Sequence, residues 1–166
     1  MLIASLTGAA VIVGIGFLMS RNPSPAAITK QEPSPASSAC SDFQEGKIVI
    51  GEKSLDVAIA ATAAEKAQGL SGCSELPKNA GMLFPYDAPK QAAFWMKNML
   101  MPLDIIWIRD GKVVGLEANV PVPRPNAPEK NLPQYHSPGP VDHVLEIKAG
   151  GAAEYEIKAG SDIVFE

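Results

Sequence analysis

The chain has 166 residues, of which 46% are hydrophobic, and a formal net charge of −4 at pH 7. This length allows one folded domain of ordinary size with a shorter additional segment. The sequence contains no cluster of basic residues, whereas phosphate binding requires a concentrated positive face. We therefore expect no nucleic-acid partner.

The first 41 residues differ in composition from the rest of the chain. Residues 2–19 carry no charge, and their number reaches the lower limit for a membrane-spanning helix. We predict a transmembrane anchor at residues 1–21; the alternative is a cleaved secretory signal, although the usual basic n-region is missing. Residues 22–41 are rich in Pro, Ser and Ala, as is typical of a disordered linker. The expected arrangement is a single-pass protein of the cell membrane with its domain, residues 42–166, outside the cytoplasm.

The folded part carries the period-2 alternation and turn signals of short β-strands. Strands are predicted, in chain order, at residues 47–50, 54–60, 81–85, 92–96, 103–109, 112–117, 143–148 and 162–165. Between the second and third strands, Thr62 and Glu65 match a capping box, which predicts a short helix that ends at Gly69. Further along, Asp110-Gly111 is a strong hairpin signal.

A proline-rich excursion over residues 121–140 interrupts this series of strands. A loop of that length in a compact domain is usually functional or disordered. Residues 150–155 are expected to hold a helical turn before the last strand. Several short strands with one or two short helices predict a mainly β domain, a compact and mostly antiparallel β-sandwich or barrel.

The two cysteines, Cys40 and Cys73, permit one internal pair. In an oxidising compartment a disulfide between them would join the end of the linker to the domain, with a stabilisation of about 3–4 kcal/mol for a loop of this length. Two unrelated thiols are the alternative, and the sequence leaves both open.

Four segments of the folded part resemble the DUF192 family. They are GLSG at 69–72, GMLF at 81–84, FWMKNMLMPLDI at 94–105 and VLEIKAG at 144–150. The resemblance covers about residues 54–165 and implies a compact, mainly β domain, often exported or membrane-attached, without an established activity. Two positions depart from the family pattern. Cys73 stands where members commonly carry a basic residue, and the tripeptide at 160–162 replaces the usual Gly-Asp.

The strongest candidates for a binding site are Trp95, near the end of a predicted strand, and the two residues Lys97 and Asn98 that follow that strand. Lys97 can bind a carboxylate or a phosphate, and Asn98 can both donate and accept hydrogen bonds. The alternative is structural, with Asn98 closing the turn through its side chain and Lys97 in solvent. The next residues, 99–101, are apolar, so they either pack inward or form the rim of a pocket.

Two carboxylates are candidates for binding or catalysis. Asp104 borders a strongly apolar strand, so it must be paired or hydrogen-bonded, either to Lys97 or to backbone amides of the preceding turn. If Glu146 converges with Asp104, the two would form the acid/base pair of a glycoside hydrolase. The strand period, however, places Glu146 toward solvent by default. His136 and His143 lack the spacing of a zinc site, and no metal or cofactor is expected.

The first hypothesis is therefore a membrane-tethered, extracytoplasmic binding or interaction domain for a small-molecule, glycan or protein ligand. The alternative is a hydrolase of an envelope polymer that uses Asp104 and Glu146. A third hypothesis is an assembly factor for an envelope complex, which would present a flat apolar patch instead of a pocket.

Overall fold

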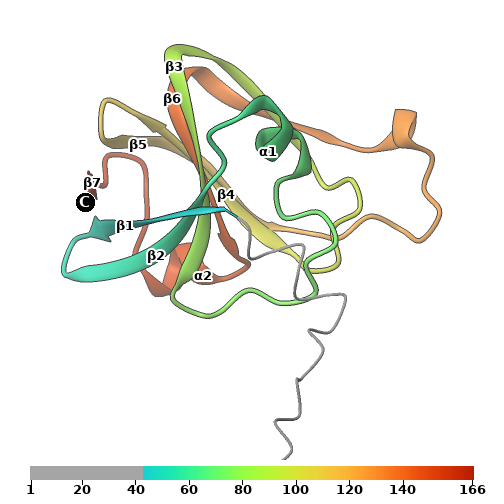
Figure 1. The fold of residues 1–166 in the computed structure, drawn as a ribbon, viewed down its shortest axis with the longest axis horizontal. Helices are drawn as coiled ribbons and strands as arrows, with labels where there is room; N and C mark the ends of the chain where they lie inside the picture. The colour runs from blue at the N-terminus through green and yellow to red at the C-terminus, as the bar shows by residue number, and fades with distance from the viewer. Residues whose placement is uncertain (1–42) are drawn as a thin grey trace, which may run out of the picture. The chain divides into compact units, whose positions relative to one another are not determined.

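The computed structural model describes residues 43–166, which form one curled seven-stranded sheet (Figure 1). The strands are β1 (Gln44–Ile50), β2 (Lys53–Ile59), β3 (Ala80–Trp95), β4 (Leu103–Arg109), β5 (Lys112–Val120), β6 (Gln134–Lys148) and β7 (Ile163–Phe165). Their order in the sheet is β5-β4-β6-β3-β2-β1-β7. Strands β2 and β3 pair in parallel, and the other neighbours pair antiparallel. The expected mainly β domain is confirmed, as a half-barrel made from a single sheet.

The curl brings the two outer ends of the sheet together at the β4–β5 hairpin. Asp110 and Gly111 have positive φ angles of 51° and 70°, the conformation that a two-residue hairpin turn with this twist requires. The backbone N–H of Ile163 donates to the Gly111 carbonyl at 2.8 Å, and that of Val113 donates to the Ser161 carbonyl at 2.9 Å. The predicted hairpin is confirmed, and its turn also joins β5 to the segment that enters β7.

The helices in residues 43–166 are short. Helix α1 (Ala63–Gln68) begins with the predicted capping box: Thr62 Oγ1 accepts from the Glu65 N–H, and the Glu65 carboxylate accepts from the Thr62 N–H. The helix ends at Gly69 as predicted, and this residue has φ 50° and ψ −140°, a positive-φ conformation other than the left-handed helical one that commonly ends a helix. Helix α2 (Gly151–Glu154) and the 3₁₀ helix η2 (Glu129–Asn131) are each about one turn long.

Strands β3 and β6 differ most from the predicted strand ranges. The sequence predicted that Pro85 ends a strand, but β3 continues to Trp95. The register between β3 and β6 shifts directly after Pro85. Such a bulge tolerates the backbone N–H that proline lacks. Strand β6 begins at Gln134 instead of residue 143, so the irregular excursion is shorter than predicted. Strand β4 pairs with β6 only from His143 onward, which leaves the earlier part of β6 as an edge where proline is tolerated.

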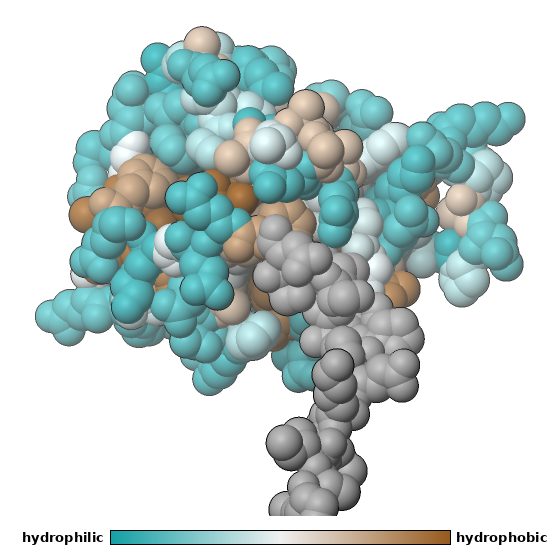
Figure 2. Space-filling view, in the orientation of Figure 1, coloured by the Kyte–Doolittle hydropathy of each residue, from teal (hydrophilic) through white to brown (hydrophobic). Residues whose placement is uncertain are grey.

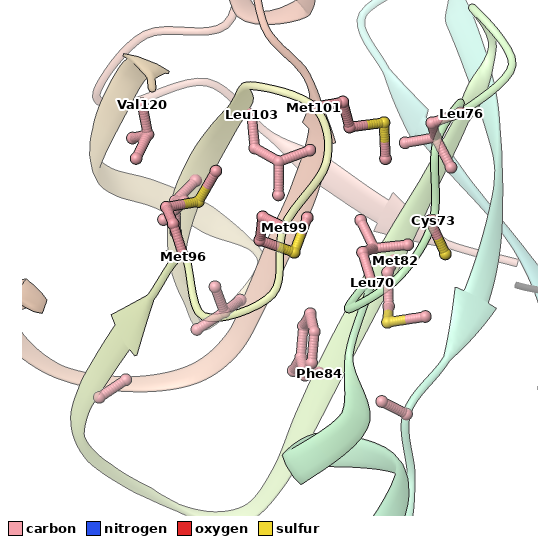
Figure 3. Packing of buried hydrophobic residues seen from close by; sticks show 14 of the residues in the cluster. Leu70, Cys73, Leu76, Met82, Phe84, Met96, Met99, Met101, Leu103 and Val120 are labelled. Atoms are coloured by element: carbon pink, nitrogen blue, oxygen red, sulfur yellow. The ribbon is translucent and has the colours of Figure 1, made fainter. Parts of the chain in front are cut away.

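The sheet buries a different apolar cluster on each face. The methionine-rich cluster contains Ala60, Leu70, Cys73, Leu76, Met82, Phe84, Ala92, Met96, Met99, Met101, Leu103, Ile105, Trp107, Val120, Val141 and Val144 (Figure 3). The aliphatic cluster contains Ile48, Ile50, Leu55, Val57, Leu83, Ile106, Ile108, Val113, Leu145, Ile147, Ala152, Ile157 and Ile163. Alternate residues of β4 enter alternate clusters, because successive side chains of a strand point to opposite faces. The prediction that β4 is buried on both faces is confirmed.

The predicted anchor at residues 1–21 and the linker at residues 22–41 lie outside the described residues. No helix in residues 43–166 combines the length and the apolar character that crossing a bilayer requires.

Candidate functional site

The turn between β3 and β4, residues 96–102, is fixed by the loop that follows α1. The Gly72 N–H donates to the Asn98 carbonyl at 3.0 Å, and Ser71 Oγ donates to the Lys97 carbonyl at 3.1 Å. Asn98 has a φ of 57°, a left-handed conformation that asparagine adopts more readily than most residues. Two segments that resembled one family in sequence, GLSG and WMKN, therefore contact each other directly.

The apolar residues of this turn point in different directions. Met99 and Met101 lie in the methionine-rich cluster and are 8% and 6% exposed (Figure 3). Leu100, between them, is 60% exposed. Both sequence-based alternatives are therefore found in one turn, since the two methionines pack inward and the leucine remains on the surface.

Residues 121–133 form an extended loop, which we call the proline arm, that projects from the sheet beside this turn (Figure 1). Short-range backbone hydrogen bonds shape it: Ala127 N–H donates to the Arg124 carbonyl, and Leu132 N–H donates to the Glu129 carbonyl, at 3.1 and 3.0 Å. In the space-filling view the outer surface of the arm is largely hydrophilic (Figure 2). The arm is ordered by its own turns and by strands β5 and β6 at its ends.

A groove lies between the proline arm and the body of the domain. It consists of two adjoining cavities of about 770 Å³ and 590 Å³, which share most of the arm as a wall. Met96 and Tyr135 line the first cavity, and residues 97–100 line the second. Volumes of roughly 300–1,000 Å³ with mainly apolar walls and a few polar groups are typical of small-molecule sites. We call this feature the arm groove.

Three charged side chains line the arm groove. Lys97 Nζ lies 2.6 Å from Glu129 Oε2, an ion pair that links the turn to the arm. The same ammonium lies 5.2 Å from the centre of the Trp95 ring, within cation–π distance. Arg124 lines both cavities and forms no ion pair with another residue of the described part of the chain. The groove is therefore locally cationic although the chain is acidic.

The predicted ligand-binding residues are not all brought together. Lys97 and Asn98 line the arm groove. Trp95 is 40% exposed and reaches the groove only through its contact with Lys97. Asp104 does not line it; this carboxylate is 0% exposed and accepts hydrogen bonds from the backbone N–H groups of Asn119 and Ala152, at 2.7 and 2.8 Å. Asp104 therefore ties β4 to β5 and α2 instead of holding the turn that precedes it.

Glu146 is buried, whereas the strand period suggested solvent. It faces the methionine-rich cluster between its cross-strand neighbours Met82 and Ile105. The side chain is 5% exposed and makes no hydrogen bond or ion pair with another described residue. Burial raises the pKa of Glu146 to about 8, because desolvation disfavours the charged form. A neutral carboxylic acid therefore lies beneath the apolar cover of this face at neutral pH.

Asp104 and Glu146 lie on opposite faces of the sheet. Asp104 pairs with Ile147 in the register of β4 and β6, and Glu146 pairs with Ile105. Since neighbouring positions of a strand alternate between faces, the sheet itself separates the two carboxylates. Neither carboxylate lines the arm groove, and the two point away from each other across the sheet.

Cys73 is fully buried in the methionine-rich cluster and is disulfide-bonded. The other half of the predicted pair, Cys40, lies outside the described residues. Of the two histidines, His143 stacks on Phe165 with ring centres 4.4 Å apart, and its Nδ1 lies 2.8 Å from Asp142 Oδ1. Within residues 43–166 no cluster of three or more His, Cys, Asp or Glu side chains has an arrangement suited to a metal ion.

Arg124, Glu129 and Tyr135 were not identified from the sequence as site residues. The available signal was the proline-rich excursion itself, since loops of that length in compact domains are often functional. The pairing of Glu129 with Lys97 joins residues 32 positions apart, and only the path of the arm shows it.

The comparisons with known proteins agree with this architecture. The family model described as DUF192, "Uncharacterized ACR", matches residues 46–165. A solved protein of unknown function from Novosphingobium aromaticivorans is 32% identical, with 75% of this chain and 87% of that chain covered and a TM-score of 0.67. A proposed transcription regulator from Sinorhizobium meliloti is 26% identical, with 74% and 95% covered and a TM-score of 0.65. No curated protein matches the chain. From the match over residues 46–165, the chain belongs to the DUF192 family.

Proposed function

We propose that this protein is a membrane-tethered, extracytoplasmic binding domain whose ligand occupies the arm groove. The observation that carries the proposal is the groove itself, a largely apolar cavity lined by Lys97 and Asn98 on one side and the proline arm on the other. Apolar walls supply most of the contact area for a ligand, and a few fixed polar groups supply orientation. The residues of the WMKN segment would provide those polar groups.

The proposed location follows from the composition of the N-terminal residues. An uncharged segment at 2–19 would act as the anchor, and the linker at 22–41 would hold the domain away from the membrane. A ligand of the cell envelope or its surroundings is then within reach of the groove.

The alternative functions have less support. A hydrolase that uses Asp104 and Glu146 lacks a shared site, because the sheet separates these carboxylates. Binding to nucleic acid requires a concentrated positive face, and the net charge of −4 does not favour it.

Thermal melting of the full chain against a panel of metals, glycans, peptides and organic acids tests the proposal. A ligand at a hundred times its Kd adds about 2.7 kcal/mol and raises the midpoint by several degrees. We expect a shift that Lys97→Ala reduces and that the matched control Lys148→Ala, an exposed lysine outside the groove, leaves unchanged. A shift that persists in full with Lys97→Ala and with a groove-filling Ala127→Trp would show that the ligand binds elsewhere.

A further inference from the structure

We propose that the ligand of the arm groove carries a carboxylate on an apolar body, and that Glu129 occupies the position of that carboxylate in the free protein. This inference rests on the proposed function and names the chemical class of its ligand. Glu129 would then act as an internal competitor that an acidic ligand must displace from Lys97.

The arm groove already holds a carboxylate, that of Glu129. Glu129 Oε2 lies 2.6 Å from Lys97 Nζ, a distance typical of a charge-assisted hydrogen bond. The Trp95 ring centre lies 5.2 Å from the same ammonium, so the lysine contacts an aromatic face as well as the carboxylate. An ammonium placed in this way suits the carboxylate of a ligand as well as that of Glu129.

The ion pair between Lys97 and Glu129 can be opened at little cost in free energy. The side chains of Lys97 and Glu129 are 39% and 54% exposed, and solvent-exposed ion pairs contribute little stability. Opening the pair therefore lowers ligand affinity by a factor of about five at most, or about 1 kcal/mol. Since Glu129 belongs to the arm and Lys97 to the turn, displacement requires only that the glutamate side chain rotate toward solvent.

The groove also contains a second cation, Arg124, which is not paired with a carboxylate of the described residues. Arg124 lines both cavities and has no ion-pair partner in residues 43–166. A guanidinium offers five donors in a planar fork that matches a carboxylate in two-point contact. When a ligand displaces Glu129, the groove presents two cations, Lys97 and Arg124, and no described anion. An acid is then favoured over a neutral or basic ligand of the same shape.

Apolar side chains line the arm groove around these cations. Leu100 and Val122 are 60% and 42% exposed and line the second cavity. Met96 and Tyr135 line the first cavity together with prolines of the arm. These surfaces would contact an apolar body next to the acidic group. A free organic acid and the C-terminus of an apolar peptide share this chemistry, and the probes below separate them.

Isothermal titration calorimetry on the full chain in lipid nanodiscs tests the inference, with empty nanodiscs as the blank. The probes are 4-phenylbutyrate with its neutral amide, and acetyl-Val-Leu with a free or an amidated C-terminus. We expect one acid to bind at least about ten times more tightly than its amide. Its carboxylate takes over the Lys97 contact from Glu129 and gains Arg124 in addition, and hydrogen bonds to a charged group contribute about 1.5–3 kcal/mol. The pair that shows the preference identifies the source of the carboxylate.

Two variants test the competitor directly. Glu129→Gln should tighten binding of the acid up to about fivefold and leave the amide unchanged, whereas Arg124→Gln should weaken binding of the acid alone. Glu52→Gln, an exposed glutamate outside the groove, is the matched control and should have no effect.

The possible failures are distinguishable. Equal binding of acid and amide that Ala127→Trp abolishes would overturn the carboxylate inference and leave the proposed function standing. Binding of the acid that neither Glu129→Gln nor Arg124→Gln alters would place it outside the groove and contradict both. If no acid binds to the Glu129→Gln protein, the inference is overturned, and the broader ligand panel then decides the proposed function.

Discussion

The buried carboxyl of Glu146 makes a specific prediction about stability and pH. Its pKa is about 8 in the folded protein, whereas the ordinary value for glutamate is 4.5. Below pH 4.5 both the folded and the unfolded chain hold the proton, so this group has no effect on stability. Between pH 4.5 and pH 8 the unfolded chain loses the proton and the folded chain keeps it, and stability therefore falls as pH rises.

The magnitude follows from the difference between the two pKa values. Each pH unit in this interval lowers the free energy of unfolding by about 1.4 kcal/mol. The loss is then about 3 kcal/mol at pH 7 and about 5 kcal/mol above pH 8, relative to pH 4. Glu146→Gln has nearly the same shape and does not titrate, so the variant should gain stability over the parent by these amounts as pH rises.

Urea unfolding followed by tryptophan fluorescence at pH 4, 7 and 9 measures this difference. A difference in the free energy of unfolding between the parent and Glu146→Gln that is the same at every pH reflects the packing of the amide. The prediction concerns only how this difference changes with pH. The exposed Glu52→Gln serves as the control that corrects for general pH effects. If the parent and the Glu146→Gln protein lose stability in parallel from pH 4 to pH 9, the carboxyl is not held neutral and the reasoning is refuted.

Three further substitutions have defined expectations. Asp104→Asn should lower the free energy of unfolding by about 2–3 kcal/mol, because the amide keeps one acceptor oxygen and either the Asn119 N–H or the buried Ala152 N–H loses its partner. A loss below about 0.5 kcal/mol in urea would contradict this role. Thr62→Ala should cost about 1 kcal/mol through the lost helix cap, and thermal melting of the double variant with Glu65→Ala should show less than additive losses. Asp142→Asn tests the opposite pH dependence. Burial raises the pKa of Asp142, but hydrogen bonds from the Asp110 backbone N–H and from His143 lower this pKa below its ordinary value overall. Its contribution is therefore present above pH 3.8 and is lost as pH falls through the folded pKa, so the parent and variant melting temperatures should converge toward acid pH.

The amino-acid sequence was sufficient to predict the local elements whose signals lie within a few residues. The structure confirms the capping box at Thr62 and the turn at Asp110-Gly111. Both depend only on neighbouring residues: the first on hydrogen bonds between side chains and backbone three residues apart, the second on the φ angles of two adjacent residues. The ends of β3 and β6 were predicted less well. The effect of Pro85 on a strand depends on whether the partner strand needs the missing N–H, and that is decided by register over long distances.

The candidate site, too, could be predicted only in part from the sequence. The sequence alone showed that Lys97 and Asn98 begin a turn, that residues 121–140 contain a long proline-rich excursion and that the chain resembles the DUF192 family. The tertiary structure decided that the arm returns over that turn, so that Glu129 meets Lys97. It also decided that Asp104 and Glu146 lie on opposite faces. The reason is physical: alternation within a strand is a local property, but which residues of two distant strands share a face depends on a register that only the assembled sheet defines.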